Sequence, residues 1–259
     1  MDIEIMRYLA AKTGLGLNYI SKDEKLSYIL SQLSGIFPEQ VVLKGGTAIN
    51  RVYLARTGVS RFSEDIDLDF LISGTLHERI ESIKKGMAEI EGFDVRGPRI
   101  LHRTLRFDCY YQNELGHRDR VKVEFYLSAG KYLSYSLELI KSPFMDAYPS
   151  VFNTYSFEDL LAKKLMALHN RTEGKDIYDS FHMLNMDFDR ERLMEALSFG
   201  TEFYRIEGDF FESLTERLEG ALERSRYIGD STNHFIPGSL RPNWREMIRT
   251  VMENLERKI

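Results

Sequence analysis

Hydrophobic residues follow a helical period at the start of the chain and an alternating period farther on. Residues 41–43 predict a short buried strand, followed by a glycine turn at 45–46 and a helix over about 47–56. Two alternating segments, 105–111 and 121–127, predict strands, so the first part of the chain mixes helices with strands. Two helices are predicted by apolar residues at i, i+3 and i+4 spacing, the first ending at Pro38 and built on Leu26, Ile29, Leu30, Leu33, Ile36 and Phe37, the second built on Leu76, Ile80, Ile83, Met87 and Ile90.

The stretch SRFSEDIDLDF, residues 60–70, places a carboxylate at every second position. Asp65, Asp67 and Asp69 alternate with apolar residues, so a strand over about residues 66–72 turns all three carboxylates to one face. Aspartate is a poor strand residue, and like charges crowded on one face cost stability. The pattern therefore indicates either a compensating cation or a solvated edge strand whose charges deter aggregation.

After Tyr155 the period is helical almost throughout. Ser156 and Asp159 stand at capping-box spacing and mark a helix start. The turn formers of residues 229–243 predict a loop before the last helix. The apolar stripes of the first and last helices of this half consist of Phe157, Leu160, Leu161, Leu165 and Leu168, and of Trp244, Met247, Ile248, Val251, Met252 and Leu255.

The change of period predicts an α+β protein with two parts. We expect a small mixed-sheet α/β core with an N-terminal helical segment in residues 1–145, and a mainly helical module in residues 146–259. The seam between them is expected near residues 141–155. Strands of the first part should cluster around one polar face.

Composition excludes several function classes. The chain has 259 residues and 43% hydrophobic content, enough for a substantial core. The single Cys109 excludes an internal disulfide framework, and the six histidines form no HxxxH or HExxH pair that would hold zinc. No GxSxG elbow is present, and no apolar run approaches the roughly 18 residues of a membrane span. We expect a cytoplasmic protein, because one cysteine fits a reducing compartment.

The charge of the chain bears on its partners. A formal net charge of −5 gives the whole molecule no electrostatic signature of a nucleic-acid binder. A local basic patch and an ordinary solvated face are both open interpretations of one group of arginines, Arg99, Arg103, Arg106, Arg118 and Arg120.

Carboxylates from two strands are candidate ligands for a divalent cation. Magnesium prefers hard oxygen ligands and keeps substrate phosphates as partners, so Asp65 and Asp67 suit a nucleotide site. Glu124 points the same way as Lys122 on a later strand and would supply a third ligand if the two strands are neighbours.

The stretch LKGGTAIN, residues 43–50, is a candidate phosphate-binding turn. Glycines let the backbone approach phosphate oxygens, and the helix that follows offers free N–H groups. No Walker pattern and no GxGxxG fingerprint occurs in the chain. Two glycines in a strand-to-helix turn also have a purely steric explanation, which stays open.

Lys164 is placed along an otherwise apolar helical row with Phe157, Leu161 and Leu168. A buried ammonium needs an anionic partner, and Asp176 or Asp179 on the next helical segment would supply it, sharing the lysine with nucleotide phosphate when that is bound. The alternative is that Lys164 extends along the stripe into a structural salt bridge.

The combination of these motifs resembles a known family. Gly45-Gly46, the Asp-x-Asp at 65 and 67, and a later carboxylate resemble the polymerase-beta-like nucleotidyltransferase superfamily. More closely, KGGTAI, RFSEDIDLD, KVEF and EDLLAKKLMALHNRTEGKDIYD, within residues 41–181, resemble the AbiEii/AbiGii-type nucleotidyltransferase toxins of abortive-infection and toxin–antitoxin systems. One departure from the superfamily is the interval of 18 residues between Gly46 and Asp65, which is long but resembles the insertion of this subfamily.

The resemblance implies an activity and a cofactor. It implies a transferase that uses Mg²⁺ or Mn²⁺ to move an NMP from an NTP to an acceptor, tRNA or protein, and that has an antitoxin partner. Alternatives are an inactive nucleotide-binding or partner-binding module and a metal-dependent phosphohydrolase. The implied catalytic residues are Asp65, Asp67, Glu124, Lys164 and Asp179, of which the first three bind metal, and the implied nucleotide-binding residues are Lys44, Gly45, Gly46, Thr47, Ser63, Arg171, Lys175 and Asp176.

Overall fold

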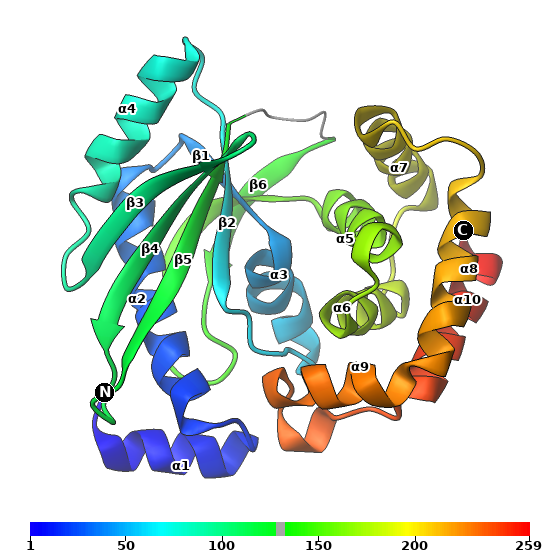
Figure 1. Cartoon of the computed structure of the whole chain (residues 1–259), viewed down its shortest axis with the longest axis horizontal. Coiled ribbons are helices and arrows are strands. Elements are labelled where there is room, and N and C mark those ends of the chain that lie inside the picture. The colour runs from blue at the N-terminus through cyan, green and yellow to red at the C-terminus, as the bar shows by residue number, and fades with distance from the viewer. Residues whose placement is uncertain (128–132) are drawn as a thin grey trace. The chain divides into compact units, whose positions relative to one another are not determined.

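The chain forms two compact units in the computed structural model, whose described residues are 1–127 and 133–259 (Figure 1). Described residues 1–127 and 135–154 belong to the first unit, and 133–134 and 155–259 belong to the second. The elements of the first unit are α1 Ile3–Thr13, α2 Leu17–Ile36, β1 Val41–Lys44, α3 Gly45–Ala48, β2 Asp65–Phe70, α4 Leu76–Met87, β3 Asp94–Leu101, β4 Thr104–Gln112, β5 Arg118–Tyr126, β6 Tyr135–Ile140 and β7 Ser150–Tyr155, whose last residue falls in the second unit.

The acidic strand lies in the middle of a mixed sheet. The strand order is β3-β4-β5-β2-β1-β7-β6, with β2 antiparallel to β1 and parallel to β5. β2 therefore has a hydrogen-bonded neighbour on both sides, and the interpretation of it as an edge strand is wrong. The predicted α+β class, with a mixed sheet followed by a helical part, is confirmed.

One face of this sheet is the apolar core of the first unit. Ile66, Leu68 and Phe70 of β2 are fully buried, as are the alternate residues Val123 and Phe125 of β5. α2 lies behind the sheet in Figure 1, and Leu26, Ile29, Leu30 and Leu33 of its predicted apolar row are buried. Each such side chain contributes roughly 1.5–3 kcal/mol by leaving water. The opposite face therefore carries the polar residues of the same strands.

Three strands were missed from the pattern. In β3 only Val95 and Pro98 are partly buried, and the register shifts between Arg96 and Arg99, so no apolar alternation marks it. β6 does alternate, but Tyr135, Leu137 and Leu139 are exposed. Strand pairing rather than burial defines β3 and β6. The third missed strand, β7, is mostly buried.

The segment after the glycine turn is less regular than the single helix predicted over 47–56. The α-helical turn α3 is followed by a π-helical turn, Ile49–Tyr53, and a 3-10 turn, Leu54–Thr57. Gly58 ends this segment with a φ of +73°, a value that favours glycine. Arg51 ties this segment to α2, because its guanidinium donates to Ser27 Oγ at 2.9 Å and to Asp23 Oδ1 at 2.6 Å.

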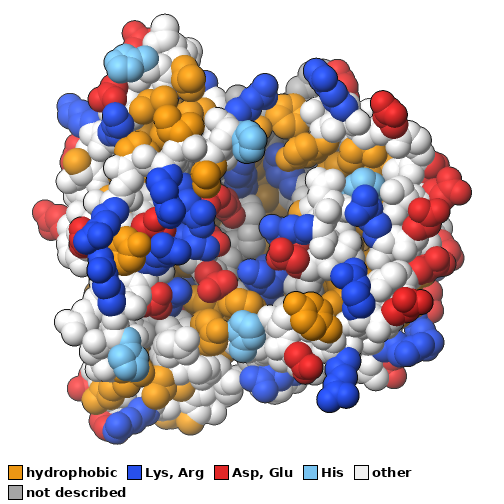
Figure 2. Space-filling view, in the orientation of Figure 1, with side chains coloured by type: hydrophobic (Ala, Val, Ile, Leu, Met, Phe, Trp, Pro, Cys, Tyr) orange, Lys and Arg blue, Asp and Glu red, His pale blue; other side chains and the backbone are white. Residues whose placement is uncertain are grey.

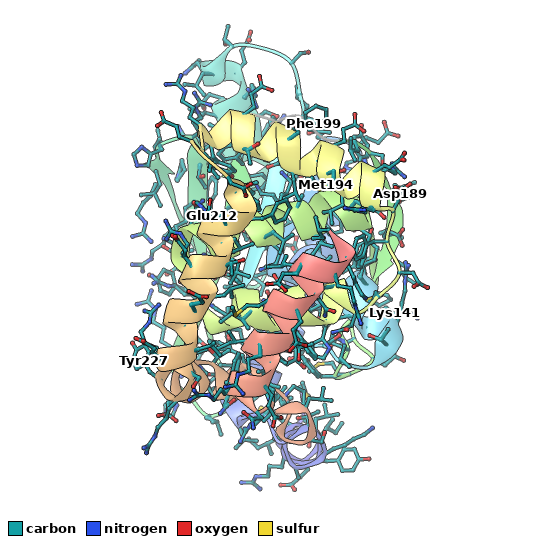
Figure 3. All side chains as sticks on the ribbon, turned by 90° about the vertical axis from the view of Figure 1, so that its right-hand side faces the viewer. Lys141, Asp189, Met194, Phe199, Glu212 and Tyr227 are labelled. Carbon is teal, nitrogen blue, oxygen red and sulfur yellow. The ribbon has the colours of Figure 1, made fainter. Side chains whose placement is uncertain are left out.

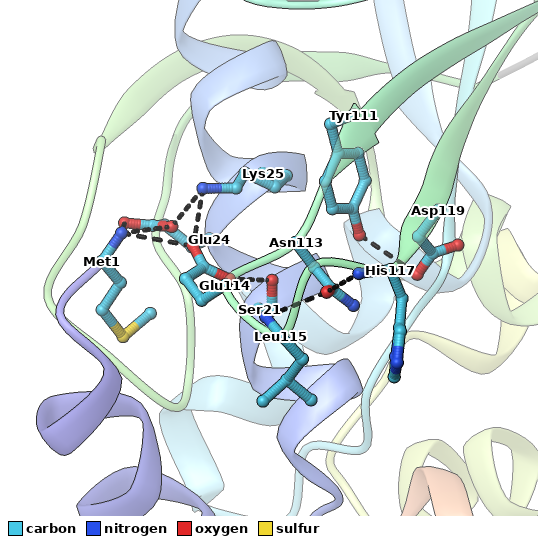
Figure 4. Close-up of polar contacts among 10 residues, drawn as sticks. All are labelled: Met1, Ser21, Glu24, Lys25, Tyr111, Asn113, Glu114, Leu115, His117 and Asp119. Carbon is cyan, nitrogen blue, oxygen red and sulfur yellow. Dashed lines mark hydrogen bonds and ion pairs between the residues drawn. The ribbon is translucent and has the colours of Figure 1, made fainter.

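A polar network ties the β4–β5 hairpin to α2 (Figure 4). Glu114, in the hairpin turn, accepts hydrogen bonds from Ser21 and from Lys25, the latter at 2.8 Å. Asn113 Oδ1 accepts from the backbone N–H groups of Leu115 and His117 and so holds the turn. The hairpin is therefore fixed at its turn as well as along its strands.

The second unit is helical. It contains α5 Phe157–Arg171, α6 Gly174–Leu184, α7 Arg190–Tyr204, α8 Phe210–Glu223, α9 Ser225–Thr232 and α10 Trp244–Lys258. Ser156 caps α5 by accepting from the Asp159 N–H, as the spacing predicted. α8 and α10 lie side by side in Figure 3. No helix in the described part of the chain is long and apolar enough to cross a membrane.

The prediction of a loop over residues 229–243 is wrong in part. α9 extends to Thr232, and two 3-10 turns, Asn233–Phe235 and Gly238–Leu240, follow it. Gly229 is helical and lies against the Trp244 ring, where an added Cβ would approach Cδ1 to 2.7 Å. Close packing thus outweighs the turn propensity of this stretch.

Candidate active site

Two neighbouring strands bring the predicted carboxylates together. In the parallel pair of β2 and β5, Asp67 stands opposite Glu124, and Asp65 stands opposite Lys122. In the antiparallel pair of β2 and β1, Asp67 also stands opposite Lys44. Paired residues project from the same face of a sheet. The condition set for Glu124, that its strand neighbours the acidic strand, is therefore met.

Asp65 and Glu124 each have a cation close by. Lys122 Nζ lies 3.3 Å from Asp65 Oδ1, and Arg106 Nε lies 3.2 Å from Glu124 Oε1. These positive charges offset the repulsion between the carboxylates that alternate along the strand. Arg106 and Lys122 were recognised in the sequence as basic residues but not as partners of the acidic row.

The third aspartate of the row has a different role. Asp69 is fully buried and forms an ion pair with Lys44. The Lys44 ammonium also lies 4.5 Å from the centre of the Tyr126 ring, a cation–π distance. Lys44 is thereby held at the end of β1, directly before the glycine turn.

The glycine turn is shaped by contact with the carboxylates. Gly45 has a φ of +70°, and a Cβ added there would overlap the Asp67 carboxylate. A Cβ added to Gly46 would approach Ser63 Oγ to 2.9 Å. Thr47 Oγ1 lies 3.1 Å from Ser63 Oγ and donates to the backbone carbonyl of Asp65. The turn, Ser63 and the acidic strand are thus one packed arrangement, which requires both glycines.

Asn50 connects this turn to the segment before the acidic strand. Its Nδ2 donates to the Gly46 carbonyl at 3.0 Å, and its Oδ1 accepts from the Arg61 N–H at 2.8 Å. Its own carbonyl accepts from Ser60 Oγ at 2.7 Å. Asn50 could not be recognised from the sequence, because only the fold brings Gly46 and Arg61 to its side chain.

The donor set fits a hard divalent cation by its chemistry. Carboxylate oxygens on alternate positions of one strand are ligands that Mg²⁺ accepts, usually with waters and substrate phosphates completing the shell. Within residues 1–127 and 133–259, however, no group of three His, Cys, Asp or Glu side chains is arranged as a metal site. Glu124, the third carboxylate expected at this site, is paired with Arg106.

The second unit contains a buried charge cluster at the other predicted residues. Lys164, whose side chain is 7% exposed, lies 2.9 Å from Asp176 Oδ1 and 3.0 Å from Asp179 Oδ2. Arg171 Nε donates to Asp176 Oδ2 at 2.7 Å. Both aspartates are fully buried. The anionic partners expected for a lysine in an apolar row are therefore present.

Electrostatics keep Asp176 ionised in spite of its burial. Burial raises the pKa of the Asp176 carboxyl, but Lys164 and the hydrogen bond from Arg171 outweigh it and hold that pKa below its usual range. The Lys175 ammonium lies 4.7 Å from the centre of the Phe235 ring.

A mixed sheet with paired strand aspartates beside a glycine turn defines a nucleotidyltransferase-like class of protein. The chain belongs to the AbiEii family, since the family model described as nucleotidyl transferase AbiEii toxin of a type IV toxin–antitoxin system matches residues 29–257. It is accordingly a nucleotidyltransferase of the toxin type. Family membership implies an NTP substrate and an antitoxin partner.

Solved structures agree with this fold. MenT4, a nucleotidyltransferase toxin from Mycobacterium tuberculosis H37Rv, aligns with a TM-score of 0.66 at 20% identity, over 99% of this chain and 90% of its own. JHP933 from Helicobacter pylori aligns with a TM-score of 0.51 at 16% identity, over 94% of this chain and 96% of its own. No curated protein matches the sequence. At these identities the structural likeness concerns the fold alone.

Proposed function

We propose that the protein transfers an NMP from an NTP to an acceptor in a reaction that depends on a divalent metal. The observation that carries this proposal is the register of β2 with its neighbours, which sets Asp67 beside both Glu124 and the glycine turn. In the transfer, an acceptor oxygen forms a bond to the α-phosphorus, the bond from that phosphorus to the bridging oxygen breaks, and pyrophosphate leaves.

The residues of the first unit have separate tasks in this proposal. Asp65 and Asp67 hold Mg²⁺ or Mn²⁺, which when bound offsets the negative charge that builds up on the phosphates. Gly45 and Gly46 admit phosphate oxygens to the backbone, with Thr47 and Ser63 as hydroxyl donors. Glu124 receives the acceptor proton as general base, for which its ion pair with Arg106 must open. Lys44 supplies a positive charge at the end of β1.

The buried cluster of the second unit is proposed to serve phosphate binding. The support is the charge of Lys164, whose ammonium pairs with two aspartates and has the capacity to exchange one of them for a phosphate oxygen. Asp179 and Asp176 then keep Lys164 charged and oriented. The resemblance to the AbiEii-type toxins implies that a lysine and an aspartate of this helical motif are important for transfer.

We further propose tRNA as the acceptor. The support is a row of basic side chains on the face of the sheet that carries Asp65 and Asp67, seen as blue side chains over β3, β4 and β5 in Figure 2. Arg99 and Arg118 are more than half exposed even though each is ion-paired, and exposed guanidinium groups suit phosphodiester contacts. The cytoplasm is the proposed location, because the chain has a single cysteine, Cys109, and so no internal disulfide, which fits a reducing compartment.

An assay of label and leaving group tests the proposed reaction. The full-length protein is incubated with each α-³²P-labelled NTP, Mg²⁺ and total cell extract, and labelled macromolecules and released phosphates are separated. We expect labelled RNA and pyrophosphate. Asp67→Asn should abolish labelling with unchanged circular dichroism, because it removes charge without volume. Asp146→Asn, an exposed carboxylate outside the site, is the matched control.

Two outcomes would overturn the proposal. Release of orthophosphate without labelling would assign the same carboxylates to a phosphohydrolase. Full labelling by the Asp67→Asn variant would remove the acidic strand from the mechanism.

A further inference from the structure

The helical unit contains a pocket to which the proposed reaction assigns no role. It has a volume of about 360 Å³, within the range of small-molecule sites. Residues at the end of α5, the start of α6 and along α9 line it, with Arg224 joining α8 to α9. All of these residues belong to the second unit.

The charged lining of the pocket favours an anion. Arg171, Lys175 and Arg224 come from three different parts of the unit and converge on the pocket, against a single carboxylate, Glu173. Glu173 lies 3.8 Å from Arg171 Nε, at the outer limit of an ion pair, whereas the close partner of Arg171 is Asp176. Arg171 lines the pocket wall, where its guanidinium charge favours a phosphate group.

Aromatic side chains complete the lining. Tyr227 lines the pocket and is 71% exposed, so its ring is accessible to a ligand, and Figure 3 shows it at the outer edge of the unit. Phe235 lies beneath the Lys175 ammonium. Cations beside an exposed ring match the two parts of a nucleotide, its phosphate and its base.

We propose that this pocket binds one nucleotide unit, its phosphate against Arg171, Lys175 and Arg224 and its base against Tyr227. The proposal deepens the proposed function and rests on it for the class of ligand. It adds to the proposed nucleotide-binding residues a pocket of the helical unit and two further residues, Arg224 and Tyr227. Arg171 and Lys164 share Asp176. A phosphate that draws Arg171 away from Asp176 therefore leaves this buried carboxylate more dependent on Lys164 and shifts the lysine toward Asp176. Occupancy of the pocket is thereby coupled to the buried lysine.

The single tryptophan offers a measurement in the full-length protein. Trp244 Nε1 donates to Asn233 at 2.8 Å, in the turn that carries Phe235 of the pocket wall. AMP is titrated in EDTA, with Trp244 fluorescence and calorimetry as readouts, because binding to cationic side chains needs no metal whereas the site at Asp65 and Asp67 does. Saturable binding is expected, and Arg224→Ala and Tyr227→Ala should each weaken it about tenfold.

Arg226→Ala is the matched control, since Arg226 is exposed on the same helix but does not line the pocket. Two further probes identify the source of the nucleotide. Tighter binding of the dinucleotide ApA than of AMP would indicate that the ligand is part of a nucleic-acid strand. Tighter binding of AMP would indicate a free nucleotide, and either result supports the proposal. Inorganic phosphate that binds as tightly as AMP, equal weakening by Arg224→Ala and Arg226→Ala, or no saturable binding in EDTA would each overturn it, whatever the outcome of the transfer assay.

Discussion

At the residue scale, the site depends on side chains that hold the backbone as much as on those that would meet the substrate. Asn50 is the main example, because its amide joins the glycine turn to the segment that leads into the acidic strand. We expect Asn50→Ala to lower kcat for labelled transfer by about tenfold or more, since a misplacement of about 1 Å is costly in catalysis. The KM for NTP should change less.

Asn185→Ala is a matched control for this prediction. Asn185 Nδ2 donates to the carbonyl of Phe181 at 2.8 Å, four residues back, as Asn50 does to Gly46. The two variants lose the same local hydrogen bond, but only one of them loses contact with the turn. Equal effects of both variants on kcat would show that Asn50 has a structural role alone.

Lys164 carries a second prediction at this scale. Lys164→Ala removes the charge between Asp176 and Asp179, both fully buried. Removing one partner of a buried ion pair costs about 3 kcal/mol, because the remaining charge is left uncompensated. We expect a loss of that size in the free energy of unfolding, measured by urea denaturation. Lys163→Ala, next in the chain and less buried, should cost about 0.5 kcal/mol or less.

At the scale of elements, the hairpin turn and α2 are coupled through an acid-sensitive contact. Burial raises the pKa of Glu114, but hydrogen bonds from Lys25 and Ser21 outweigh it and lower that pKa to about 2. A depressed carboxyl pKa contributes stability that is fully present above the unfolded value, near 4.5, and is lost as pH falls toward 2.

Glu114→Gln should therefore lower Tm at neutral pH and lose its effect in acid. We expect the difference in Tm between wild type and variant to be constant above about pH 5 and to close between about pH 4.5 and 2. Thermal unfolding across that range is the measurement. A difference that persists unchanged at pH 2.5 would contradict the coupling.

At the scale of the whole molecule, the elements that could be predicted from the sequence are those whose buried residues recur at a regular spacing. The acidic strand, the buried faces of β4 and β5, and the start of α5 follow from apolar spacing, and the partners of Lys164 follow from the cost of burying an ammonium. β3 and β6 were missed because their residues are mainly exposed. The central position of β2, the ion pair of Glu124 with Arg106 and the role of Asn50 depend on strand order, which apolar spacing does not contain.

The central claim is that Asp65 and Asp67 hold a divalent cation together with an NTP. The most direct measurement is an electron paramagnetic resonance titration of Mn²⁺, with and without a non-hydrolysable NTP analogue, on wild type and on the double variant Asp65→Asn with Asp67→Asn. We predict Mn²⁺ binding in wild type that tightens with the analogue and is lost in the double variant. Equal binding to both proteins, or binding indifferent to the nucleotide, would contradict the claim.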